Sequence, residues 1–133
     1  MSGVQFDVII SIGDPDLDEV IDHPNSHQLK FFDLVVGGPT NQDMDLLFDI
    51  FKKNLHKLKF LIHCSAGVSR SSAATLLLLM LDNPNNPETV VGELFRINPA
   101  AAPNEFMVKW IEDKFKVDLE DQIQTEFMRR ALS

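Results

Sequence analysis

Hydrophobic residues follow two different periods along this chain, and the alternation of the two predicts strands and helices in turn. Short apolar runs predict strands over residues 6–12, 28–35 and 58–63. Apolar positions at helical spacing predict helices over residues 40–55, 71–80, 86–97 and 103–115. Thr40 and Asp43 resemble a capping box at the start of the first of these helices.

Alternating elements of this kind predict an α/β fold with a central, mostly parallel sheet flanked by helices. The chain has 133 residues, of which 44% are hydrophobic, so it is long enough to bury a core. We expect a single domain over residues 1–133. Ligands of such sheets bind beyond the carboxyl ends of the strands, and we expect the functional site there.

The stretch from residue 117 to 133 places apolar side chains roughly on one helical face, at Leu119, Ile123, Phe127 and Leu132. We expect this face to pack on its own domain. The alternative is a homodimer formed through this C-terminal helix.

Charge and cysteine content narrow the function classes. The formal charge of −8, without a basic stripe that has interleaved aromatic residues, argues against nucleic acid as a partner. The apolar run from Ala73 to Leu81 is too short for a bilayer, which needs ~20 residues, so we expect no membrane partner. One cysteine excludes an intramolecular disulfide, and no signal peptide is recognisable. Both observations favour a cytoplasmic location.

The chemistry of the chain concentrates in His63-Cys64-Ser65-Ala66-Gly67-Val68-Ser69-Arg70, between the third predicted strand and the next helix. Backbone N–H groups at a helix N-terminus have no intrahelical partner, so they bind an oxyanion and favour a thiolate on Cys64. Arg70 offers planar paired donors that match two phosphate oxygens. The pattern predicts a phosphate cradle with its own nucleophile. The predicted phosphate-binding residues are Ser65, Ala66, Gly67, Val68, Ser69 and Arg70.

A lone cysteine is often only another buried apolar residue. The joint spacing of His63, Cys64, Gly67, Arg70 and Ser71 argues against that interpretation, because such a pattern should arise by chance in on the order of one chain in ten thousand. We therefore interpret Cys64 as functional.

The same residues resemble the HCxxGxxRS signature, with its CX5R spacing, of the cysteine-dependent protein tyrosine phosphatases, and most of all its small dual-specificity branch. The resemblance implies a protein tyrosine phosphatase-like fold and a two-step hydrolysis that needs no metal or cofactor. In the first step the Cys64 thiolate attacks phosphorus to give a cysteinyl-phosphate, which water then hydrolyses. The resemblance further implies that Arg70 holds phosphate oxygens, His63 tunes the thiolate and Ser71 assists the departure of sulfur.

Phosphate-ester cleavage also needs a proton donor for the leaving oxygen, and a positioned acid typically contributes ~10²–10⁴-fold. The resemblance implies an aspartate about thirty positions before the cysteine. Asp33 lies 31 positions before Cys64, at the end of an apolar, strand-like run where a loop begins. Its rivals Asp43, Asp45 and Asp49 fall inside the next predicted helix and closer to the cysteine.

The expected substrates are phosphorylated proteins or small phosphate esters. The chain has no tyrosine, so the tyrosine-bearing loop that clamps phosphotyrosine in larger relatives is absent and the resemblance implies a shallow or open pocket. The loop carries no lysine between Cys64 and Arg70, which favours phosphoproteins over inositol phospholipids. The alternatives are a catalytically silent phosphopeptide-binding module, a rhodanese-like sulfurtransferase, and a thiol-redox or arsenate-reducing enzyme. The last would ordinarily recruit a second cysteine.

Overall fold

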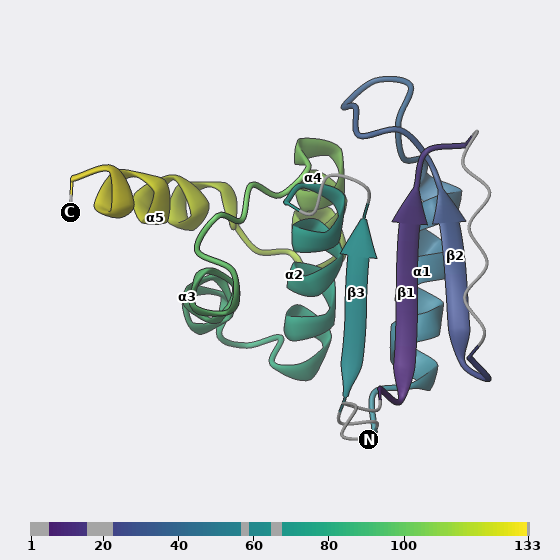
Figure 1. Ribbon diagram of the computed structural model, residues 1–133. Helices are drawn as coiled ribbons and strands as arrows, with labels where there is room; N and C mark the ends of the chain where they lie inside the picture. The colour runs from purple at the N-terminus through teal and green to yellow at the C-terminus, as the bar shows by residue number, and fades with distance from the viewer. Residues whose placement is uncertain (1–5, 16–22, 57–58, 65–67, 133) are drawn as a thin grey trace, which may run out of the picture.

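The computed structural model describes residues 6–15, 23–56, 59–64 and 68–132, and a three-stranded parallel sheet stands at its centre. The strand order is β2–β1–β3, with β1 over Val8–Gly13, β2 over Ser26–Lys30 and β3 over Phe60–Cys64. Ile12 of β1 pairs with Leu29 on one side and Cys64 on the other, so the three strands end at the same edge. Figure 1 shows this edge, where the arrowheads lie together. The predicted parallel α/β arrangement is confirmed.

Five helices complete the described part of the chain: α1 (Asn41–Lys53), α2 (Arg70–Asp82), α3 (Pro87–Ile97), α4 (Glu105–Phe115) and α5 (Glu120–Leu132). In Figure 1, α1 lies behind β1 and β2, while α2 lies beside β3. Side chains of all five helices join one core with Val8, Ile10 and Ile12 of β1, which point to the same face because strand side chains alternate. Within the described ranges, no helix combines the length and apolar character needed to cross a bilayer.

Two predicted helix starts are confirmed by their capping bonds. The Thr40 hydroxyl accepts the Asp43 N–H at 3.2 Å, and the Asp43 carboxylate accepts the Thr40 N–H at 2.9 Å. At the start of α4, Asn104 Oδ1 accepts the Met107 N–H at 3.1 Å. Both caps satisfy N–H groups that a helix leaves unpaired at its start.

The prediction of a second strand reaching residue 35 is wrong, because β2 ends at Lys30. Lys30 pairs with Gly13, the last residue of β1, and the bond from the Phe31 N–H to the Gly13 carbonyl oxygen, at 3.0 Å, is the last between this segment and β1 among the described residues. The apolar residues that extended the predicted strand lie in a loop beyond the sheet edge instead. Their exposed fractions are 42% for Phe32, 51% for Leu34, 49% for Val35 and 87% for Val36. We call residues 31–39 the Asp33 loop.

Two glycines allow the Asp33 loop to fold back sharply. Gly37 has a φ of 83°, in the left-handed region that favours glycine. A Cβ at Gly38 would collide with the Leu34 carbonyl oxygen. A larger residue at position 38 would therefore open the loop and displace Asp33.

The C-terminal helix α5 packs on its own domain, as expected. Ile123 is buried in the core, and the Phe127 ring stands edge-on to Phe95 of α3 with the ring centroids 5.6 Å apart. Leu119 is fully buried just before the helix, whereas the side chain of Leu132 lies outside the described residues. The described apolar face that a homodimer would use is thus largely covered within the chain.

Candidate active site

Cys64 ends β3, and α2 begins six residues later at Arg70. The cysteine is half-buried, and its sulfur contacts the first turn of α2. The Ser71 N–H points at Sγ over 3.4 Å, and the Ser71 hydroxyl oxygen lies 3.3 Å from the same sulfur. The positive end of the α2 dipole is therefore directed at Cys64.

The loop between these elements is described only from Val68 onward, so three predicted phosphate-binding residues, Ser65, Ala66 and Gly67, lie outside the described residues. The Val68 carbonyl accepts the Ala102 N–H at 3.0 Å, and the Ser69 carbonyl accepts the Asn104 N–H at 3.2 Å. No hydrogen bond between described residues uses the backbone N–H groups of Val68, Ser69 or Arg70. These N–H groups are donors that an anion can use.

Among the described residues, the Arg70 guanidinium is held through Nη1. Its side chain is 3% exposed, and Nη1 donates both to Asp14 Oδ1 at 2.8 Å and to the Phe31 carbonyl oxygen at 2.7 Å. Its Nε is buried and has no hydrogen-bond partner among the described residues. A buried donor without an acceptor costs about 1–3 kcal/mol, so such groups are rare in native structures. A phosphate oxygen in the loop would supply the missing acceptor.

Asp14 is a site residue that sequence reasoning missed. It follows β1 at the sheet edge where Cys64 ends β3, and its side chain is 37% exposed. The available signal was its position, because residues just beyond the carboxyl ends of parallel strands meet at one edge. Asp14 fixes the orientation of Arg70 and leaves Nε on the other edge of the guanidinium.

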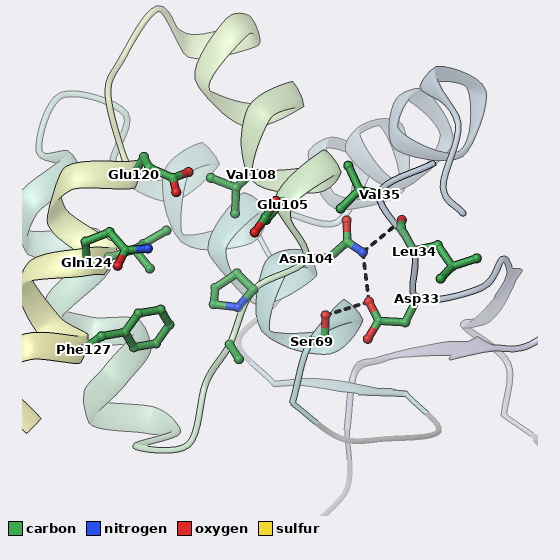
Figure 2. A pocket seen from close by; sticks show the side chains of 13 residues that line it. Asp33, Leu34, Val35, Ser69, Asn104, Glu105, Val108, Glu120, Gln124 and Phe127 are labelled. Atoms are coloured by element: carbon green, nitrogen blue, oxygen red, sulfur yellow. Dashed lines mark hydrogen bonds between the residues drawn. The ribbon is translucent and has the colours of Figure 1, made fainter. Parts of the chain in front are cut away.

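Asp33 lies against the described part of the cysteine loop (Figure 2). Its Oδ1 accepts the Ser69 hydroxyl at 2.7 Å and the Asn104 side-chain amide at 2.9 Å. Asn104 is 5% exposed, caps α4, and also donates to the Leu34 carbonyl oxygen at 3.3 Å. Asn104 falls at the start of the helix predicted over residues 103–115, but sequence reasoning missed that it anchors the Asp33 loop to the cysteine loop.

The rival aspartates all lie on α1 and have other contacts. The Asp43 carboxylate belongs to the capping box with Thr40, and Asp49 forms an ion pair with Lys53 at 2.9 Å. Asp45 borders a shallow hollow next to Trp110. Among these four aspartates, Asp33 is the one with a hydrogen bond to the cysteine loop. Its role as the acid stays a prediction.

His63 points away from the Cys64 sulfur. The two residues are consecutive in β3, so their side chains lie on opposite faces of the sheet. The His63 Nε2 lies 2.6 Å from the hydroxyl oxygen of Ser11, its buried partner residue in β1. Any effect of His63 on Cys64 must therefore pass through the backbone of β3.

Comparison with solved structures identifies the fold. DUSP15 superposes with a TM-score of 0.63 at 16% identity, over 92% of this chain and 79% of that one. A mouse putative dual-specificity phosphatase complexed with zinc tungstate gives 0.61 at 16% identity, over 92% and 74%. A point variant of human DUSP28 gives 0.59 at 18% identity, over 95% and 80%. No family model and no curated protein matches the sequence. The chain has the fold of the small dual-specificity phosphatases, as the signature implied.

Proposed function

We propose that this protein is a tyrosine or dual-specificity phosphatase that hydrolyses phosphate monoesters of phosphoproteins through a cysteinyl-phosphate on Cys64. The observation that carries the proposal is the buried Nε of Arg70, which has no hydrogen-bond partner among the described residues. The neighbouring backbone N–H groups of Val68, Ser69 and Arg70 likewise bond to no described residue. In this proposal, these donors bind the phosphate beside the Cys64 sulfur, which lies against the first turn of α2. A cytoplasmic location would keep this single cysteine reduced.

In the proposed first step, the Cys64 thiolate forms a bond to phosphorus, and the bond from phosphorus to the ester oxygen breaks. Arg70 and the loop N–H groups stabilise the charge that spreads over the other phosphate oxygens, which is where preorganised donors have their largest effect. Asp33 gives its proton to the departing oxygen, so the alcohol or phenol leaves neutral.

In the proposed second step, water attacks the cysteinyl-phosphate and sulfur departs as a thiolate. The Asp33 carboxylate takes a proton from the attacking water, which restores the acid for the next cycle. The Ser71 hydroxyl lies 3.3 Å from Sγ and donates a hydrogen bond to the negative charge that returns to sulfur. Inorganic phosphate then leaves the cradle.

An assay on an aryl phosphate beside a panel of phosphopeptides, with EDTA present, tests this proposal. We expect turnover of both substrate types without added metal. A silent binding module would instead bind phosphopeptides without releasing phosphate, and a rhodanese-like enzyme would convert thiosulfate and cyanide to thiocyanate. Either result in place of phosphate release would contradict the proposal.

Replacing Asp33 by asparagine tests the acid. Asparagine keeps the oxygen that accepts from Ser69 and Asn104 but has no proton to give, so the geometry persists while acid catalysis is lost. We expect a ~10²–10³-fold slower reaction for esters of poorly acidic alcohols, and a smaller loss for an activated aryl phosphate. The basic limb of the pH–rate profile should disappear as well.

Asp45→Asn and Asp43→Asn are the controls for the Asp33 variant. Asp45→Asn should leave both rates unchanged, while Asp43→Asn should lower thermal stability through the weakened cap without a leaving-group effect. A leaving-group-dependent loss at Asp43 or Asp45, with only a small uniform effect at Asp33, would overturn the assignment.

A further inference from the structure

A groove extends from the Asp33 loop to the C-terminal helix. It encloses about 370 Å³ between the start of α4, the Asp33 loop and α5. Figure 2 shows Asp33 and Ser69 at one end, Glu105 and Val108 in the middle, and Glu120 and Phe127 at the other. Because Ser69 also belongs to the predicted cradle, the groove begins at the site proposed to bind the phosphate.

The charged side chains that line the groove are all acidic. Its lining includes the carboxylates of Asp33, Glu105 and Glu120 and contains no lysine or arginine. Elsewhere on the described surface Glu93 and Glu126 pair with arginines, but neither Glu105 nor Glu120 forms an ion pair with a described residue. The groove therefore has two carboxylates available for a cation that another molecule brings.

Apolar side chains lie between these carboxylates. Leu34 and Val35 are about half exposed where the Asp33 loop borders the groove, and Val108 and Phe127 form other parts of its lining. Lysine and arginine combine an apolar stem with a charged head, so their side chains match such a surface better than a purely polar residue does. The formal charge of −8 on the whole chain also attracts positively charged partners.

We propose that this groove binds the segment of a phosphoprotein that flanks the phosphorylated residue, and that it selects arginine or lysine in that segment. The proposal rests on the proposed function for its phosphorylated substrate. With the phosphate in the cradle, the flanking chain that passes Ser69 enters the groove and brings a basic side chain to Glu105 or Glu120. The groove thus defines a substrate class, namely phosphoproteins with basic residues beside the phosphosite.

Matched phosphopeptides test the selection. The peptides carry one phosphoresidue and differ only in two flanking residues, Arg-Arg or Glu-Glu, placed before or after it. One of the two flanks, before or after the phosphoresidue, should enter the groove. For that flank, we expect kcat/KM to be roughly fivefold or more higher with Arg-Arg than with Glu-Glu, and the difference to shrink in high salt. Glu120→Gln and Glu105→Gln should each reduce this ratio about two- to fivefold, the scale of exposed charge pairs.

Asp121→Asn is the matched control, because it removes the same charge from the same turn of α5 but does not line the groove. It should leave the ratio unchanged. A kcat/KM ratio of basic to acidic peptide near one, or equal effects of Asp121→Asn and Glu120→Gln on that ratio, would contradict selection by the groove. Either result would leave aryl phosphate turnover, and thus the proposed function, intact.

Binding to the Cys64→Ser variant, measured by fluorescence anisotropy with the same peptides, separates the two proposals further. Tighter binding of the basic peptide that depends on Glu120 supports the groove even if the wild-type protein releases no phosphate, in which case only the proposed function fails. Equal binding of basic and acidic peptides, or no binding of either, contradicts the groove.

Discussion

Replacing Cys64 by serine should reduce phosphatase turnover to background while the protein still folds and binds phosphate-like oxyanions. A serine hydroxyl is a poor nucleophile near neutral pH, whereas a thiolate at the start of a helix is a good one. The expected loss is on the order of 10⁴–10⁶-fold, the scale seen when the nucleophile of a covalent enzyme is removed. The serine oxygen can still accept the Ser71 N–H, so local structure should persist.

Two measurements check this result. Steady-state rates on an aryl phosphate give the loss, and a thermal shift on adding vanadate or tungstate shows that the cradle still binds. Comparable activity in the Cys64→Ser variant would exclude a covalent mechanism through this residue.

Removing Arg70 should have the second largest effect. Arg70→Ala deletes the paired donors that we propose to bind the phosphate, and we expect a loss of about 10³-fold in kcat/KM together with weaker vanadate binding. The variant also leaves the Phe31 carbonyl oxygen without its donor, which should cost about 1–3 kcal/mol of folding free energy. Arg70→Lys keeps a positive charge but not the planar pair of donors, and should recover only part of the rate.

Asp14→Asn tests whether the orientation of the Arg70 side chain contributes to the rate, because the variant keeps Arg70 but weakens the contact that orients it. Asparagine keeps an oxygen that can accept from Nη1 at reduced strength, so the guanidinium stays but is held less firmly. We expect a fall of about tenfold or less in kcat/KM and a matching fall in vanadate affinity, with the pH–rate profile unchanged.

The Arg70→Ala variant has its own contradicting outcome. Near-wild-type rates for Arg70→Ala would show that Arg70 does not contact the phosphate.

The order of the elements and the position of Cys64 at the end of a strand could be predicted because both depend on local sequence. The capping box at Thr40, the start of α4 at Asn104 and the segment from Cys64 to Arg70 are each encoded within a few neighbouring residues. Parallel strands then bring the ends of β1 and β3 to one edge, which places Asp14 near Arg70.

The missed features depend on contacts between distant segments. The apolar residues after Lys30 suggested a longer strand, but the end of pairing with β1 turned them into an exposed loop. That loop borders the groove, so the error concealed a candidate binding surface. The contact of Asn104 with Asp33 spans 71 positions, and the pairing of Arg70 with Asp14 spans 56, so no local pattern indicates either one.

The loop signature implied that His63 tunes the Cys64 thiolate, and this role stays a prediction. Adjacency in sequence to Cys64 means opposite sides of the sheet once both residues are in a strand. The bond between His63 and Ser11 makes it a residue that fixes β3 against β1. We expect its influence on Cys64 to be indirect.

Trapping the intermediate tests the central claim most directly. Acid quenching during turnover, followed by digestion and mass spectrometry, should find a phosphoryl group on the peptide that contains Cys64. The amount should rise in Ser71→Ala, because that variant lacks the hydroxyl expected to assist the departure of sulfur. Phosphate release that continues while no phosphoryl group is ever found on Cys64, in either protein, would contradict the covalent mechanism.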